Sequence, residues 1–197
     1  MCPDTQSWRF MNSLLLRILS MSLAFSSPVF AGERSASPAE PDVPPEMVRL
    51  AHAMVGHWKN VETMERSRFF PSGGERTGLS TCRLATAGTN LVCEGDSDGS
   101  AGPLHHLIVI WWDVDARLYR FFTCFREGKE SHCKVRGTAH WEGEDFVNDY
   151  AEEVDGKPVK MRDSFLHITH DSHLLVAAME DSPGHFKTMI TTRSTRR

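Results

Sequence analysis

Apolar residues recur along this chain with two different periods, and the change comes just before Trp58. Upstream of that point, the stretch "PEMVRLAHAMVG" carries apolar residues at the i, i+3, i+4, i+7 spacing of one helix face: Met47, Leu50, Ala51 and Met54. Pro45 suits the first turn of a helix, and Gly56 suits its end. The pattern therefore predicts one short helix between Pro45 and Gly56.

From Trp58 onward the helical period gives way to short apolar or alternating runs, separated by turn sequences such as "SGGE", "VDGKP" and "DSPG". Evenly spaced strands joined by short hairpins are typical of an up-and-down antiparallel β-barrel, because few long crossovers are available. A β-sandwich is the alternative. We expect an all-β, up-and-down antiparallel barrel of about ten strands after the short N-terminal helix. The expected strands are 57–65, 75–85, 90–96, 105–113, 117–126, 131–141, 145–153, 158–168, 174–180 and 185–193.

The dipeptide Asp155-Gly156 is a strong signal for a two-residue hairpin turn and sets the register of the strands on either side. With this turn, one face of the hairpin is mostly apolar and the other, where Asp149 opposes Arg162, is mostly charged. The apolar face also carries Asn148 and Asp163, which form either a buried structural pair or part of a wet interior that holds a ligand. The candidate ligand-binding residues on this face are the opposed pairs Phe146 and Phe165, Asn148 and Asp163, and Tyr150 and Met161.

Four cysteines stand symmetrically about two turn sequences. Cys124 and Cys133 are equidistant from Gly128-Lys129, and Cys82 and Cys93 are equidistant from the "AG" of "ATAGTN". Antiparallel pairing about these turns puts the two members of each pair opposite each other, where α-carbons approach to roughly 4.5 Å, within reach of a disulfide. We expect the disulfides Cys82–Cys93 and Cys124–Cys133, while pairings that cross between the hairpins and free thiols remain open. The spacing is not that of a zinc site.

The first residues have the pattern of an export signal. Arg9 and Arg17 supply positive charge around a short apolar run, and "VFA" then offers small or compact residues for cleavage. We therefore expect a signal peptide at 1–31, with translation starting at Met1 or Met11. The run is too short and interrupted to favour spanning a bilayer. The mature protein is expected to be secreted or periplasmic and not membrane-bound.

Two further segments follow the expected cleavage site. Residues 32–45 are rich in proline and hold little that could pack, so they predict a disordered linker. Residues 46–197 are expected to form the barrel domain. Cleavage removes Cys2 and leaves an even number of cysteines, which favours disulfides in an oxidising compartment.

The start and the end of the predicted barrel resemble calycin-type proteins. The stretch "LAHAMVGHWKNVETM" has their short helix followed by Gly-x-Trp, here Gly56 to Trp58, and the last strand ends in a Thr-Arg pattern with Arg193. In lipocalin-like barrels a tryptophan of the first strand packs under an arginine of the last. The resemblance therefore implies that Trp58 and Arg193 stack and close one end of the barrel.

Residues 46–195 as a whole resemble the bacterial lipocalin-like family numbered 1579 among the domains of unknown function. The stretches that carry the likeness are "IVIWWDVDARLYRFF", "VRGTAHWEGEDF" and "EVDGKPVKMRDSFLHI". The resemblance implies a secreted or cytoplasmic β-barrel with no established activity, and it brings no catalytic residues. The four cysteines are not part of the family's general pattern and look like an adaptation to export.

Composition and motifs exclude several classes of function. The net charge of −4 gives no sign of a nucleic-acid partner. The run "HITHDSH" gathers histidines, but strand residues three apart face opposite ways, so no metal site is expected there. "GDSDG" fits the nucleophile-elbow pattern but lacks the helix that must follow it, and no catalytic residue is predicted. No cofactor is expected, although ten histidines leave haem or another small ligand open.

Two neighbouring strand sequences, "LIVIWW" and "RLYRFFTCF", are apolar on both faces, whereas a barrel strand normally shows one face to water. Either the N-terminal helix or a second copy in a homodimer is expected to cover the outer face. The sequence as a whole favours a non-enzymatic protein that binds a small, partly apolar ligand inside the barrel. The alternatives are an interaction barrel without a ligand and an enzyme that uses histidine and aspartate side chains in the cavity.

Overall fold

The structure, a computed structural model, describes residues 42–127 and 129–197. The predicted signal peptide, most of the predicted linker and Gly128 lie outside the described residues. The helix forms where the apolar spacing predicts it, and ten strands follow. The elements are α1 Pro45–Met54, β1 Gly56–Met64, β2 Gly74–Ala85, the 3-10 turn η1 Thr86–Gly88, β3 Asn90–Gly99, β4 Leu104–Asp113, β5 Leu118–Glu127, β6 Glu130–Glu142, β7 Asp145–Val154, β8 Lys157–Leu166, β9 Ser172–Ser182 and β10 His185–Arg196.

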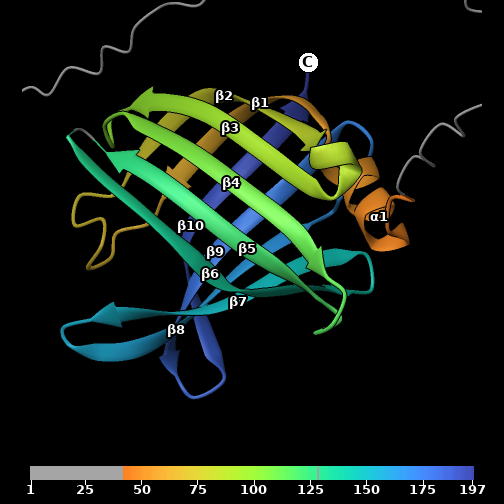
Figure 1. Cartoon of the computed structure of the whole chain (residues 1–197). Coiled ribbons are helices and arrows are strands. Elements are labelled where there is room, and N and C mark those ends of the chain that lie inside the picture. Colours follow the sequence, from red (N-terminus) through yellow and green to blue (C-terminus); the bar gives the residue numbers. More distant parts are fainter. Residues whose placement is uncertain (1–41, 128) are drawn as a thin grey trace, which may run out of the picture. The chain divides into compact units, whose positions relative to one another are not determined.

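The strands close into one antiparallel barrel (Figure 1). Each strand pairs with its neighbours in sequence, and β1 pairs with β10 to complete the ring. The predicted up-and-down barrel is therefore confirmed, and the closure of β1 on β10 removes the sandwich alternative. β10 continues to Arg196, past the predicted end at residue 193, because its last residues still pair with the start of β1.

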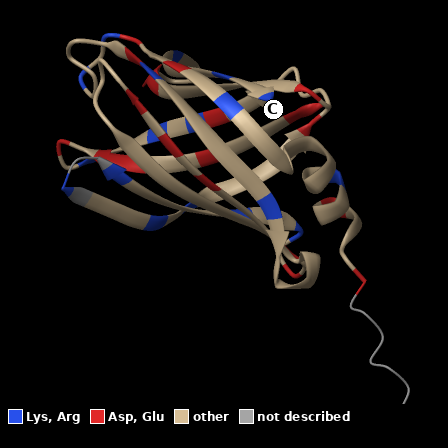
Figure 2. Cartoon of the chain, turned by 90° about the horizontal axis from the view of Figure 1, so that it is seen from above, with Lys and Arg blue, Asp and Glu red and all other residues tan. Residues whose placement is uncertain are grey.

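Alternation along the strands separates an inner and an outer face. In β1 the inward positions are Trp58, Asn60, Glu62 and Met64, and all four are buried, while the residues between them are exposed. Basic and acidic residues are interspersed over the strands in the view of Figure 2.

The helix α1 packs against one end of the barrel (Figure 1). Trp58 donates its indole N–H to the carbonyl of Met54 at 2.9 Å and so fastens the end of the helix to the first strand. The buried apolar residues at this end form one cluster: Met47, Leu50, Ala53, Met54, Trp58, Cys82, Leu91, Cys93, Ile110, Tyr119, Phe121, Ala139, Phe146 and Phe165. The hydrophobic core of the barrel is therefore concentrated at the helix end.

Because α1 packs on inward-facing residues, the predicted helical cover for the outer wall of β4 and β5 is wrong. Phe122 on β5 pairs with Val135 on β6, and Val135 is 61% exposed. Cover of this wall by a second copy stays a prediction. In the part of the chain that the structure describes, no helix is long and apolar enough to cross a membrane.

Both predicted cysteine pairs are confirmed. Cys82 lies opposite Cys93 and Cys124 opposite Cys133, each with α-carbons 4.0 Å apart and the sulfurs joined as a disulfide. The pairings that cross between hairpins and the free thiols are therefore wrong. Two such pairs indicate an oxidising compartment. The first disulfide belongs to the buried core, whereas Cys133 of the second is exposed on the outer wall.

The predicted stacking of Arg193 on Trp58 is wrong. Arg193 pairs with Val61 on the outer face and is exposed. The guanidinium over the Trp58 ring belongs to Arg196, whose Cζ lies 4.4 Å from the ring centroid and which pairs with Trp58 in the ladder. Residues three apart on a strand point to opposite faces. The predicted Arg193 therefore lies on the outer face, whereas Arg196 lies on the same face as Trp58.

Gly56 makes room for this closing contact. A β-carbon at Gly56 would lie 2.0 Å from a guanidinium nitrogen of Arg196, and the glycine φ of +152° is one that other residues rarely adopt. Arg196 also donates to the carbonyl of Val55 at 2.6 Å. In the Gly-x-Trp sequence, the glycine therefore leaves space for the Arg196 side chain, which stacks on the tryptophan.

We predict that Trp58 and Arg196 are energetically coupled and that Arg193 is not. Trp58→Ala should lower the free energy of unfolding by about 3 to 5 kcal/mol, because it leaves a cavity in the core. Arg196→Ala should cost about 1 to 2 kcal/mol for the lost cation–π contact and hydrogen bond. Urea unfolding of the single and double variants measures the coupling. Arg193→Ala is the matched control, and strict additivity of Trp58→Ala with Arg196→Ala would contradict the contact.

Candidate ligand-binding site

All six predicted ligand-binding residues lie on the inner face of the β7–β8 hairpin, and they pair as the Asp155-Gly156 turn predicts. Phe146 opposes Phe165, Asn148 opposes Asp163, and Tyr150 opposes Met161. The two phenylalanines belong to the apolar core at the α1 end. The other members lie progressively further from α1 along the hairpin. The hairpin therefore runs from the packed end of the barrel into its more polar part.

Polar and charged side chains gather beyond the core. Tyr150 donates its hydroxyl to Asp163 at 3.2 Å, and Arg136 donates to the Tyr150 oxygen at 3.4 Å. Arg136 also lies 3.1 Å from a carboxylate oxygen of Glu152, which in turn pairs with Lys134. The network joins β6, β7 and β8, and it places two carboxylates and Arg136 together on the inner face, with the exposed Lys134 at its edge.

Burial perturbs the ionisation of this network. Removal from water raises the pKa of Asp163 to about 6, against the opposing effects of Arg136 and of the Tyr150 hydroxyl. Burial and the nearby Asp163 carboxylate together raise the pKa of Tyr150 above its usual range. Tyr150 is therefore a hydrogen-bond donor at neutral pH. Asp163 is mostly ionised at neutral pH but accepts a proton on mild acidification.

A bulge in β6 places Arg136 in this network. Gly137 has a left-handed φ of +58°, and the pairing of β5 with β6 shifts beside it. The extra residue lets Arg136 and Ala139, three apart in sequence, both point inward. A β-carbon on Gly137 would lie 2.0 Å from the carbonyl oxygen of Asp149, so the bulge requires glycine.

The interior beyond the core is not completely filled. Asp163, Ala177 and Met179 face inward from neighbouring strands, yet all three are only half-buried. At the α1 end, by contrast, Phe146 and Leu91 are fully buried. Inward side chains that keep solvent-accessible surface leave this part of the interior, called here the internal space, accessible to solvent. Asp163 and the apolar side chains around it can therefore be reached from solvent there.

Several polar atoms inside the barrel have no hydrogen-bond partner among the described residues. They include the hydroxyl oxygens of Ser97 and Thr123, both amide atoms of Asn148 and Nδ1 of His173. Asn148 is fully buried beside Asp163, and as a hydrogen-bond donor its amide acts to lower the pKa of that carboxyl, although the geometry falls short of a complete hydrogen bond. The structural pair considered from the sequence stays a prediction. Unpaired groups of this kind are costly and are found mainly where a site serves a ligand or water.

His173 is the one member of the "HITHDSH" run that reaches the interior, since His167 and His170 are exposed. Its ring lies 4.6 Å from Trp58 and 5.8 Å from Phe165, and desolvation together with the charge of Arg196 lowers its pKa to about 4. The imidazole is therefore neutral at physiological pH. Among the residues that the structure describes, no three histidine, cysteine or acidic side chains gather as a metal site.

The end of the barrel opposite α1 is also polar. Glu62 and Arg76 are both buried and approach to 3.8 Å, and Arg76 donates to the carbonyls of Ala101 and Gly102 at 3.2 and 2.9 Å. Arg68 on the loop after β1 forms an exposed ion pair with Asp155 at the β7–β8 turn. These contacts hold the loops at this end of the barrel.

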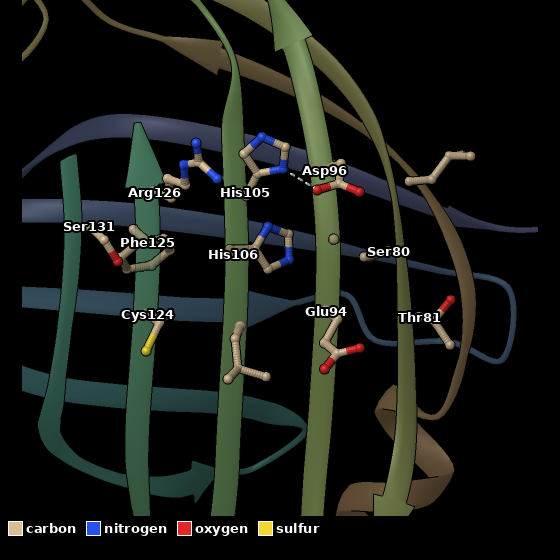
Figure 3. A pocket seen from close by; sticks show the side chains of 13 residues that line it. Ser80, Thr81, Glu94, Asp96, His105, His106, Cys124, Phe125, Arg126 and Ser131 are labelled. Carbon is tan, nitrogen blue, oxygen red and sulfur yellow. Dashed lines mark hydrogen bonds and ion pairs between the residues drawn. The ribbon is translucent and has the colours of Figure 1, made fainter. Parts of the chain in front are cut away.

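A separate depression of about 580 Å³ lies on the outer wall of β2 to β6 (Figure 3). Asp96 and His105 form an ion pair there, and Arg126 lies next to His105 on the adjoining strand. Most side chains that line it belong to the outward set of their strands, so it is distinct from the barrel interior. It contains none of the six predicted ligand-binding residues.

Comparison with known proteins rests on structure, because no family model and no curated protein matches this chain in sequence. Rv2717c from M. tuberculosis superposes with a TM-score of 0.52 over 79% of this chain and 99% of that one, at 13% identity. The S-type phycobiliprotein lyase CPES from Guillardia theta gives 0.50 over 77% and 90%, at 9% identity. The chain has the lipocalin-like, calycin-type barrel fold. Membership of the family numbered 1579 stays a prediction.

The sequence pattern predicts the β7–β8 hairpin of the candidate site but not Arg136, Glu152, His173 or the Glu62–Arg76 pair. A glycine within a strand, such as Gly137, indicates a β-bulge. A bulge at this position would have predicted that Arg136 points inward. Glu62 and Arg76 oppose each other across a loop from Glu65 to Gly73. No tight turn in this loop sets the register of the two strands that it joins, so the pairing of Glu62 with Arg76 could not be predicted from the sequence.

We predict that Asp163 and His173 change stability in opposite directions on acidification. The folded-state pKa of Asp163, about 6, lies above its ordinary 3.8, so the folded protein gains stability as pH falls through this window. The folded-state pKa of His173, about 4, lies below its ordinary 6.5, so stability is lost as pH falls from 6.5 to 4. Each difference corresponds to about 3 kcal/mol at most.

Urea unfolding between pH 4 and 7 separates the two groups. Asp163→Asn should lose stability more steeply than the parent protein on acidification, because only the histidine effect remains. His173→Phe should lose less stability on acidification than the parent protein, or should gain stability. Parallel pH profiles for the parent protein and both variants would show that neither side chain has the shifted pKa described above.

Proposed function

We propose that this protein binds a small, partly apolar molecule inside the barrel. The observation that carries the proposal is the half-buried state of Asp163 and its inward neighbours beside a hydrogen-bonded network. A filled interior would favour an interaction barrel instead. Pockets that combine an apolar lining with a few converging polar groups are typical of small-molecule sites.

The chemistry of the lining suggests how such a ligand would lie. Ala177 and Met179 offer apolar surface toward the middle of the barrel, and Ile108, which packs against the core, adjoins them. Tyr150 and Asp163 offer a donor and an acceptor that are already oriented by their mutual hydrogen bond. The apolar body of the ligand would lie along the first group, and its polar end, a cation or a hydrogen-bond donor, would meet Asp163.

The enzyme alternative is supported less well. A histidine bonded to Asp163 would have suggested general acid–base chemistry. The hydroxyl that bonds Asp163 belongs instead to Tyr150, whose raised pKa keeps it protonated. We therefore infer a binding protein without a catalytic pair at this position. The disulfides and the signal-like N-terminus support action in the periplasm or outside the cell.

Blocking the internal space tests the proposal. The neutral dye Nile red should bind the parent protein with increased fluorescence, and Ala177→Phe should weaken binding at least tenfold by filling the space. Ala151→Phe adds the same ring to an exposed position on the outer face of β7 and should leave affinity within twofold. Circular dichroism checks that each variant is folded, and the smaller change Ala177→Leu serves if Ala177→Phe is not.

Two results would count against an internal site. One is equal dye affinity in Ala177→Phe and the parent protein. The other is equal loss of affinity in Ala177→Phe and Ala151→Phe. Native mass spectrometry of protein taken from its own periplasm or medium then reports the mass of any bound molecule and the number of subunits.

A further inference from the structure

A second pocket lies beside α1, outside the internal space. It has a volume of about 330 Å³ and is formed where α1, the turn between β4 and β5 and the end of β6 meet. Nothing in the proposed interior site uses it. Six side chains matter to its chemistry: Glu46, Arg49, Trp112, Arg117, Tyr119 and Trp141.

The floor of this pocket is a rigid group of aromatic rings. Tyr119 is almost fully buried, donates its hydroxyl to the carbonyl of Glu46 at 2.8 Å and accepts the indole N–H of Trp141 at 3.1 Å. Trp112 packs edge-on against Tyr119 with ring centroids 4.9 Å apart. Both tryptophans remain half-buried, so part of each ring faces the pocket. Such rings offer flat surfaces to a planar molecule.

Two guanidinium groups stand over this floor. Arg49 lies 4.0 Å above the Trp141 ring and donates to the carbonyl of Gly143 at 2.5 Å, which holds its side chain in place. Arg117 is exposed at the rim. Within residues 42–127 and 129–197, neither arginine forms an ion pair with a carboxylate. The Glu46 side chain also lines the pocket, so two positive charges face one negative charge there.

The turn that presents Arg117 is strained. Arg117 has a φ of +53°, a left-handed conformation that glycine and asparagine adopt far more easily than arginine. Asp113 fixes the turn by accepting the backbone N–H of Ala116 at 3.0 Å and the side-chain N–H of Arg120 at 2.9 Å. A charged side chain at a strained position beside a cavity suggests that its guanidinium has a use there.

We propose that this pocket is a second binding site, for a planar aromatic anion such as an aryl carboxylate. The ring would lie against the exposed parts of Trp112 and Trp141, and the carboxylate would accept hydrogen bonds from Arg49 and Arg117. Arginine suits this role because its planar fork binds carboxylates with two parallel hydrogen bonds. The volume is at the lower end of the range for small-molecule pockets, about 300 to 1,000 Å³, which favours a ligand of one or two rings.

Isothermal titration of the purified protein with 1-naphthoate tests the site. We expect saturable binding with one equivalent, and at least tenfold weaker binding of the neutral analogue 1-naphthamide. Arg117→Gly should weaken naphthoate binding at least tenfold while leaving the protein as stable as before or slightly more stable, because glycine relieves the strained φ. Arg117→Lys keeps the charge and should retain part of the affinity.

Two controls separate this site from the others. Arg83→Gln removes an exposed arginine from the outer wall and should leave naphthoate affinity within twofold. Asp163→Asn alters the interior network and should also leave it within twofold. No binding of naphthoate, unchanged binding in Arg117→Gly, or equal binding of naphthoate and naphthamide would each overturn the proposal. A change in Asp163→Asn would place the probe in the interior instead and would also overturn it.

Discussion

The packing of α1 into one end of the barrel is the contact on which the chemistry of the interior depends. Met47, Leu50 and Met54 insert among inward residues of the strands and close that end with apolar side chains. Burial of three side chains of this size contributes about 5 to 9 kcal/mol in total. At the opposite end no described helix packs into the barrel, and there apolar inward residues such as Met64 are mixed with charged ones such as Glu62 and Arg76. One short helix thus divides the interior into a packed half and a half that keeps accessible surface.

This division explains why charged groups are tolerated inside. Glu62 with Arg76, and Asp163 with Tyr150 and Arg136, each form a small network that partly compensates the loss of water. Such pairs do not by themselves stabilise the fold, because replacing a buried ion pair with apolar residues of similar size often leaves the free energy of unfolding unchanged or raises it. Their presence is easier to understand if the interior has to recognise a polar group.

Sequence reasoning succeeded where a tight turn sets the register and weakened where none does. Asp155-Gly156 placed the β7–β8 pairs correctly, and the spacing of the cysteines placed both disulfides. The pairing of Glu62 with Arg76 across a long loop was not predictable from the sequence. Arg193 was predicted in place of Arg196 because β10 ends later than its apolar pattern suggests. The pocket beside α1 could not be predicted from the sequence, because it forms where three segments that are far apart in the chain meet.

The seam between β1 and β10 is the only pairing among the described strands that joins distant parts of the chain. All other pairings are local, so hairpins can form early and independently at little entropic cost. The interior acquires walls on all sides only when the seam closes. A molecule held inside would therefore oppose opening of the seam, and its binding would slow the hydrogen exchange of the β1 and β10 amides.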